Sequence, residues 1–167
     1  MESWEWLDRA RAEDAAAWLH ACCGATRWVD RMLARRPFGS HDAVLQAARE
    51  EWFALSPLDW KEAFSHHPKL GDRHALRTGF AATRTLALAE QAGVASAPGD
   101  VLDALADGNR RYEQKFGYVF IACASGQQAE ALLAALHVRL ENDPATELLL
   151  AAEEQAKITA LRLRRST

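Results

Sequence analysis

The chain has 167 residues, of which 49% are hydrophobic and 26% are charged, a balance typical of one folded globular domain with a substantial core. Its formal net charge of −3 includes no strong basic excess, so nucleic acid is not an expected partner. No apolar run approaches the roughly 18 residues that span a bilayer, so no membrane partner is expected either.

The N-terminal residues and the cysteines indicate in which cellular compartment the protein is expected. The N-terminal segment has no basic stretch followed by an apolar one, so we expect no secretory signal. Cys22, Cys23 and Cys123 are odd in number and two of them are adjacent, which is not the pattern of a disulfide framework. Reduced thiols packed among helices are the simplest interpretation, and they predict a cytoplasmic protein.

Helix signals follow one another closely in the first part of the chain. Gly24 favours a helix end before it, and Pro37 closes the next helical segment. Ser40 can cap a third helix, and a Ser-Pro-Leu-Asp sequence has the spacing of a capping box for a fourth. The fourth ends where Pro68 restrains the residue before it. These signals predict helices over residues 14–22, 26–35, 40–55 and 56–66.

The second half repeats this pattern after a loop. Residues 68–82 contain glycines and several charges and are predicted to form that loop. Stop signals at Gly93 and Gly117, and a capping Asp-Pro pair at 143–144, delimit the later helices. Helices are expected over residues 83–91, 101–115, 125–140 and 143–164. At about 11 residues a helix, the chain can hold roughly seven to nine of them.

Residues 118–124 do not fit the helical pattern. They read Tyr-Val-Phe-Ile-Ala-Cys-Ala, a continuous apolar run that fits either a buried strand or a buried extended segment. Because no second convincing strand is present to pair with it, we interpret it as extended backbone passing through the core. The sequence thus predicts an all-α, single-domain helical bundle over residues 1–167, with one short extended segment.

His67, after the fourth predicted helix, is the first candidate chemical group. An imidazole at a helix end can act as acid or base near neutral pH, and the proline after it limits where it points. Alternatively, it only stabilises the helix C-terminus. A metal site of His66, Asp72 and His74 is a further alternative, but adjacent histidines before a loop lack the spacing of zinc sites. We therefore expect no metal.

Glu90 and Arg162 are charged residues on otherwise apolar helix faces. Glu90 lies one turn from Leu86 and Ala87, so it is either at the core boundary or in a pocket. In the last helix, Gln155 and Arg162 are the polar members of an apolar stripe. A buried guanidinium needs an anionic or carbonyl partner, which can be a structural acid or a bound anion. The alternative is a frayed last turn with Arg162 in solvent.

Together these segments resemble a known family. The residues that carry the resemblance are His-Pro-Lys-Leu-Gly at 67–71, Glu-Gln-Ala-Gly at 90–93, the run from Lys115 to Ala124, the helix from Glu153 to Leu163, and Arg-Pro-Phe at 36–38. The chain is similar to the decarboxylases of 2-oxo-4-hydroxy-4-carboxy-5-ureidoimidazoline (OHCU), an intermediate between urate and allantoin. The similarity covers most of the chain, in order and with plausible spacing.

The resemblance implies cofactor-independent decarboxylation of OHCU, a small-molecule substrate, to (S)-allantoin by an all-helical homodimer. Six tryptophans could help to bury its interface. His67 and Glu90 match the family's catalytic residues. Ala87 replaces a serine that members often have, so another donor or a water must replace that hydroxyl. The positions that match substrate contacts are Pro68, Ala87, Gln91, Phe120, Ile121, Ala122, Cys123, Ala124 and Arg162.

Three rival classes remain open on the sequence alone. One is a non-catalytic helical module that holds a purine-like ligand without converting it. The others are a metal-dependent hydrolase and a purely structural dimer. The inward-facing Gln155 and Arg162 count against the structural dimer, because a scaffold rarely needs them.

Overall fold

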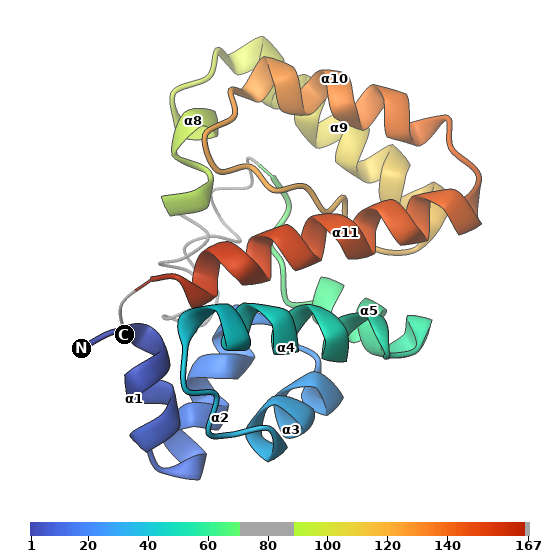
Figure 1. Cartoon of the computed structure of the whole chain (residues 1–167). Helices are drawn as coiled ribbons and strands as arrows, with labels where there is room; N and C mark the ends of the chain where they lie inside the picture. Colours follow the sequence, from blue (N-terminus) through green and yellow to red (C-terminus); the bar gives the residue numbers. More distant parts are fainter. Residues whose placement is uncertain (71–88, 166–167) are drawn as a thin grey trace. The chain divides into compact units, whose positions relative to one another are not determined.

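The computed structural model describes residues 1–70 and 89–165, and this part of the chain contains nine α-helices with defined bounds and no strand (Figure 1). The all-α class predicted from the sequence is confirmed. None of the described helices is long and apolar enough to cross a membrane. The helices are α1 (Ser3–Arg9), α2 (Ala12–Cys22), α3 (Thr26–Ala34), α4 (His41–Phe53), α5 (Pro57–Phe64), α8 (Ala92–Ala95), α9 (Gly99–Phe116), α10 (Ala129–Leu140) and α11 (Pro144–Leu163).

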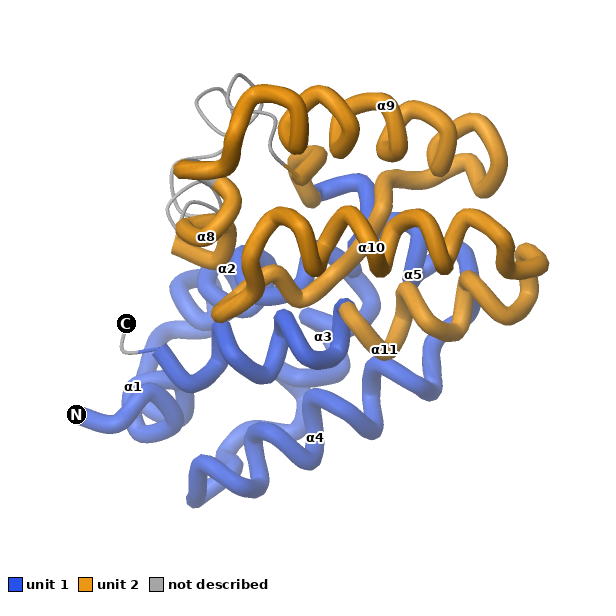
Figure 2. The backbone as a smooth tube through the Cα atoms, turned by 90° about the horizontal axis from the view of Figure 1, so that it is seen from above, with its two compact units in different colours: residues 1–66, 155–167 blue, residues 67–154 orange. Residues whose placement is uncertain are grey.

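The chain folds into two compact units, which Figure 2 colours separately. Unit 1 comprises Met1–His66 with Gln155–Thr167, and unit 2 comprises His67–Glu154. Helix α11 passes from one unit into the other, so its first half is part of unit 2 and its second half is part of unit 1. Among the residues that match the family's catalytic and substrate-contact positions, only Arg162 belongs to unit 1.

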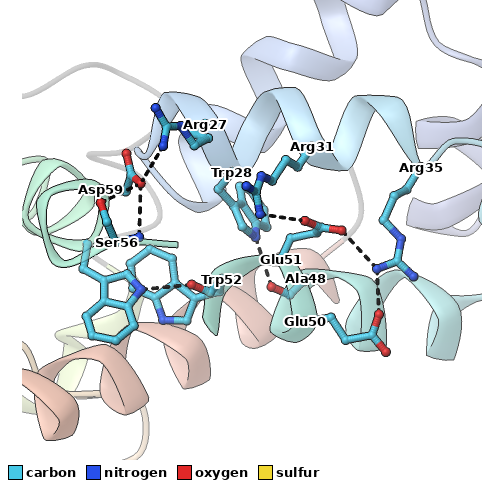
Figure 3. A network of polar contacts seen from close by, with 11 residues as sticks. Arg27, Trp28, Arg31, Arg35, Ala48, Glu50, Glu51, Trp52, Ser56 and Asp59 are labelled. Atoms are coloured by element: carbon cyan, nitrogen blue, oxygen red, sulfur yellow. Dashed lines mark hydrogen bonds and ion pairs between the residues drawn. The ribbon is translucent and has the colours of Figure 1, made fainter. Parts of the chain in front are cut away.

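Helix starts in unit 1 follow the predicted caps. The Ser40 hydroxyl accepts a hydrogen bond from the Ala43 N–H at 3.1 Å, which begins α4. At the start of α5, the Ser56 N–H donates to Asp59 Oδ2 at 3.2 Å (Figure 3). Pro57 takes the first helical position. Both caps satisfy backbone groups that a helix end leaves without a helical partner.

The core of unit 1 is built around tryptophans of α3, α4 and α5. Trp28 and Trp52 are buried in it, as is Trp60. The Trp28 indole donates to the Ala48 carbonyl at 3.0 Å (Figure 3). The Trp60 indole donates to the Trp52 carbonyl at 2.9 Å. Half of the six tryptophans therefore stabilise the interior of unit 1 and cannot contribute to a subunit interface.

Two short sequences in unit 1 have structural roles that the sequence did not reveal. Gly24 lies against His66, because a Cβ at Gly24 would approach the imidazole ring to 2.5 Å. In the Arg-Pro-Phe stretch at 36–38, the Phe38 N–H donates to Asp8 Oδ1 at 2.8 Å, and the Arg36 side chain donates to the Asp8 carbonyl at 3.2 Å. This family-like motif thus fixes the chain onto the end of α1.

Unit 2 has a hydrophobic core between α9 and α10. The two helices approach closely at Gly108, where a Cβ would lie 2.5 Å from a methyl carbon of Leu136. The core members are Leu70, Val94, Leu105, Tyr112, Phe120, Ala122, Ala124, Ala129, Leu132, Leu136 and Leu140. They come from α9, α10 and three other segments far apart in the sequence.

The structure differs from the sequence-based expectation at several boundaries. Helix α10 begins at Ala129, four residues after the predicted start, because Gly126 has a φ of 75° that an α-helix cannot contain. Helices α1 and α8 were not predicted. Residues 118–124 are neither helix nor strand, and Phe120 and Ile121 are buried, as expected for an extended core segment. The predicted 68–82 loop and 83–91 helix lie largely outside the described residues.

Candidate active site

The segment that follows His67 is attached to α9. The Lys69 ammonium forms an ion pair with Glu113 Oε2 at 2.8 Å, and the Asn109 amide donates to the Leu70 carbonyl at 3.5 Å. Leu70 itself is part of the unit 2 core. His67 is half-buried and follows the α5 C-cap, Ser65, by two residues. The backbone next to His67 is therefore attached to α9. A positioned acid–base group requires such a fixed backbone.

Glu90 and Gln91 are both buried. The exposed fraction is 8% for Glu90 and 7% for Gln91, so Glu90 is not a solvated carboxylate at the core boundary. Gly93 lies directly on the Gln127 backbone, because a Cβ there would overlap its carbonyl oxygen and lie 3.3 Å from its carbonyl carbon. Val94 enters the unit 2 core. The Glu-Gln-Ala-Gly motif is thus packed beside the turn that follows residue 124.

The 118–124 segment is held by side chains rather than by a neighbouring strand. Arg139 donates to the Ile121 carbonyl at 2.6 Å, and Gln127 donates to the Cys123 carbonyl at 2.6 Å. The Cys123 N–H donates to Glu154 Oε1 at 3.3 Å. These bonds satisfy backbone groups of a buried segment that has no sheet partner.

The three motif segments of unit 2 meet in one core. Leu70 follows the His-Pro pair, Val94 follows the Glu-Gln pair, and Phe120, Ala122 and Ala124 come from the extended segment. All five belong to the same hydrophobic cluster. The structure therefore brings the His67, Glu90 and 120–124 segments together within unit 2, although they are up to 57 positions apart in the sequence.

Arg162 is buried in unit 1, with an exposed fraction of 3%, so a solvated last turn is excluded. Its guanidinium donates to the Ala21 carbonyl at 3.1 Å. Gln155 and Thr159, on the same helix face, are buried as well, and the Gln155 amide donates to the Thr159 hydroxyl at 3.0 Å. The apolar stripe of the last helix therefore faces inward, as predicted.

Some candidate residues lie outside the described residues, namely Ala87, Asp72 and His74. Within the ranges 1–70 and 89–165, no group of three or more His, Cys, Asp and Glu side chains is arranged to hold a metal ion. His66 instead packs edge-on against His20, with ring centroids 4.9 Å apart. Burial and the neighbouring His20 lower the pKa of His66.

The buried network behind the extended segment was not predicted. Arg139 and Glu147 form a buried ion pair, with 2.7 Å between Arg139 Nε and Glu147 Oε1. The signal was present in the sequence, because Arg139 follows Leu132 and Leu136 at steps of four and three on the inward face of α10. The same reasoning that placed Arg162 inside applies to Arg139.

Replacing Gly93 by alanine is expected to destabilise unit 2 by about 1–3 kcal/mol, because the obstacle is the Gln127 backbone, which cannot rotate away as a side chain can. Gly99→Ala is the matched control, since nothing lies within 4 Å of its Cβ position. Urea unfolding of both variants measures the difference. Equal midpoints for the two variants would show that Gly93 does not pack as described.

The cysteines differ in accessibility, so we expect a thiol reagent to modify Cys123 well before the other two. Cys22 and Cys23 are buried, whereas Cys123 is partly exposed. Burial raises the pKa of the Cys23 thiol to about 12, which leaves little reactive thiolate at pH 8. Mass spectrometry after a timed iodoacetamide pulse locates the label. Labelling of Cys22 or Cys23 in the native chain at the Cys123 rate would contradict this burial.

Comparison with known proteins identifies the family of the chain. The family model for OHCU decarboxylase matches residues 8–164. The chain belongs to the OHCU decarboxylase family. The rival class of a purely structural dimer is thereby set aside.

Two curated relatives illustrate the range of the family. The uric acid degradation bifunctional protein TTL of Arabidopsis thaliana is 38% identical over 143 residues, which are 85% of this chain and 44% of that protein. The chain thus spans less than half of this bifunctional relative. The 2-oxo-4-hydroxy-4-carboxy-5-ureidoimidazoline decarboxylase of Amia calva is 34% identical over 130 residues, 77% of this chain and 73% of that protein.

Solved structures share the fold. An OHCU decarboxylase crystallised in the presence of (S)-allantoin has a TM-score of 0.73 and 36% identity, covering 89% of this chain and 94% of the other. A structure of (S)-allantoin synthase has a TM-score of 0.68, covering 96% of this chain and 52% of the other. At 18% identity, this second likeness establishes the fold alone.

Proposed function

We propose that the chain decarboxylates OHCU to (S)-allantoin in urate degradation. The observation that carries the proposal is the meeting of the His67, Glu90 and 120–124 segments in one core of unit 2, in a chain that belongs to this family. Buried polar groups beside a backbone segment suit a small, planar, polar substrate. We further propose that residues 1–167 act as one functional domain.

The substrate itself can accept the electrons of the broken bond. The carbon that loses its carboxylate also bears a hydroxyl, and the neighbouring ring carbon is an imine. When the carbon–carboxylate bond breaks, its electron pair forms a carbon–carbon double bond, and the imine pair moves to nitrogen, which takes up a proton. CO₂ leaves and an enol remains. The residues therefore have to orient the substrate and move protons.

His67 and Glu90 would perform these proton transfers. In this proposal, His67 accepts or shares the hydroxyl proton as the enol becomes the amide carbonyl of the product ring, which also favours the departure of CO₂. Glu90 orients His67 or the ureido N–H groups and can relay the proton that reaches the neighbouring carbon. Delivery to one face of that carbon produces a single enantiomer. Backbone donors at 120–124 stabilise charge that develops on the ring.

The remaining expectations belong to the same proposal. Pro68 and Gln91 would contact the substrate, and Arg162 would grip a carboxylate or ureido group with its planar guanidinium. We also propose a homodimer as the working form, by similarity to the family. The free cysteines support a reducing, cytoplasmic location.

Release of labelled CO₂ tests the activity. OHCU carrying ¹³C in its carboxyl group, generated from labelled urate, is mixed with the purified chain, and ¹³CO₂ is followed by mass spectrometry. We expect release far above the spontaneous rate, in proportion to protein concentration. A module that only binds a purine-like ligand would leave CO₂ release at its spontaneous rate, and this result would overturn the proposed function. Repeating the assay with a metal chelator tests the alternative of a metal-dependent hydrolase, because a chelator would abolish an activity that needs a metal ion.

A further inference from the structure

Three consecutive peptide units of the extended segment each have one polar end tied to a side chain. The Ile121 carbonyl accepts from Arg139 at 2.6 Å, and the Cys123 carbonyl accepts from Gln127 at 2.6 Å. Between them, the Cys123 N–H donates to Glu154 at 3.3 Å. Three side chains from the α10 region and α11 therefore fix the rotation of three adjacent peptide planes.

In each of these peptide units, the hydrogen-bonded C=O or N–H group fixes the direction of the unit's other polar group. In the described ranges the only cis peptide bond is Arg36–Pro37, so these three units are trans, with C=O and N–H directed to opposite sides. The Ala122 N–H consequently points away from Arg139, the Ala122 carbonyl away from Glu154, and the Ala124 N–H away from Gln127. Within residues 1–70 and 89–165, no backbone or side-chain group forms a hydrogen bond with these three.

Arg139 is itself rigidly placed. Glu147, fully buried, accepts from Arg139 Nε at 2.7 Å, from the Tyr112 hydroxyl at 2.5 Å and from the Asn142 amide at 3.1 Å. The Arg139 guanidinium also stacks over the Phe120 ring, 4.4 Å from its centroid. A charged, planar side chain held on several sides can keep the Ile121 carbonyl in one orientation.

We propose that Arg139, Gln127 and Glu154 are positioning residues that present the Ala122 N–H, the Ala122 carbonyl and the Ala124 N–H as a donor–acceptor–donor edge for the substrate. The inference rests on the proposed function and specifies which backbone groups bind. A ureide or ring amide offers its own C=O and N–H side by side, so it can pair with such an edge as a neighbouring strand would. Two fixed N–H donors also match charge that develops on a ring oxygen or nitrogen.

Variants of the tying side chains test the proposal by steady-state kinetics. Gln127→Ala and Glu154→Ala are each expected to lower kcat for OHCU decarboxylation about tenfold or more, with a smaller change in KM, because a misdirected donor costs most in the transition state. Glu154→Gln keeps an acceptor oxygen and should restore most of kcat. Gln128→Ala, at an exposed neighbouring position, is the matched control and should leave kcat within about twofold.

Backbone NMR tests the identity of the donors in the wild-type chain. Adding (S)-allantoin should shift the amide signals of Ala122 and Ala124 more than that of Cys123, whose N–H is already bonded. In Gln127→Ala the shift at Ala124 should shrink. The proposal is overturned if Gln127→Ala and Glu154→Ala match the Gln128→Ala control, or if Ala122 and Ala124 do not respond. A wild-type chain that gives no CO₂ release overturns the proposed function and this inference together, whereas an active chain with unresponsive variants overturns this inference alone.

Discussion

Replacing His67 by alanine is expected to lower kcat for OHCU decarboxylation by about 100-fold or more, which is the usual contribution of a positioned acid–base group. The chain should still fold, because His67 is only half-buried and the next residues keep the Lys69–Glu113 ion pair and the core position of Leu70. Steady-state kinetics, with circular dichroism as the folding check, measures the effect.

The neighbouring imidazole provides a matched control. His66 belongs to unit 1, where it packs on Gly24 and His20 and has no part in the proposed chemistry. His66→Gln should leave kcat within about threefold of wild type. A metal-dependent mechanism through His66, Asp72 and His74 would predict the reverse order. Turnover of His67→Ala within a few-fold of wild type would refute the acid–base role.

Glu147→Ala is expected to destabilise the chain by about 3–5 kcal/mol, because it leaves the Arg139 guanidinium buried without its counter-charge. Single domains are stable by only about 5–15 kcal/mol, so much of the folding free energy would be lost. The change also removes the carboxylate that accepts a hydrogen bond from the Tyr112 hydroxyl. Burial and the hydrogen bond to Glu147 raise the pKa of that hydroxyl. Urea unfolding measures the loss, and exposed Glu141→Ala should change it by less than about 0.5 kcal/mol.

A double variant distinguishes an unpaired charge from lost packing. Arg139→Met with Glu147→Leu removes both charges, and replacing a buried ion pair by apolar side chains is often close to neutral. We therefore expect the double variant to recover at least about 1 kcal/mol relative to Glu147→Ala. It should nevertheless remain a poor enzyme, because the Ile121 carbonyl has lost its donor. A double variant as unstable as the single one would contradict the charge argument.

Local sequence rules predicted the parts of the fold that depend on neighbouring residues. The caps at Ser40 and Ser56 and the stop at Gly117 act between residues a few positions apart, and each is present. The inward face of α11 also followed from spacing alone, since a stripe of apolar residues has to be buried somewhere. The extended 118–124 segment followed from its continuous apolar run and its lack of a partner strand.

Features that depend on distant contacts could not be predicted in this way. The α10 start at Ala129 depends on the positive φ of Gly126, which a helix-propensity pattern does not report. The sequence gives no sign that Gly24 makes room for His66 or that Gly93 lies on Gln127, because both pairs join separate segments. For the same reason, the side chains that tie residues 121–123 became evident only when α10 and α11 were placed beside them.

The candidate site shows the same division. From the sequence, a place at the core boundary was the more common interpretation for Glu90, and only its burial in the structure excludes a solvated carboxylate there. His67 was a candidate because it lies between a predicted helix end and a proline, and its catalytic role followed only from the family motif. The resemblance to a family supplied the chemistry, and the structure supplies the packing that brings the segments together.

The most direct test of the whole account is circular dichroism of allantoin as it forms during urate oxidation, with and without the chain. We expect the chain to make optically active (S)-allantoin appear much faster, in step with the loss of OHCU, and we expect His67→Ala to abolish the acceleration. Racemic allantoin forming at the same rate in both samples would mean that His67, Glu90 and the 120–124 backbone do not catalyse this reaction.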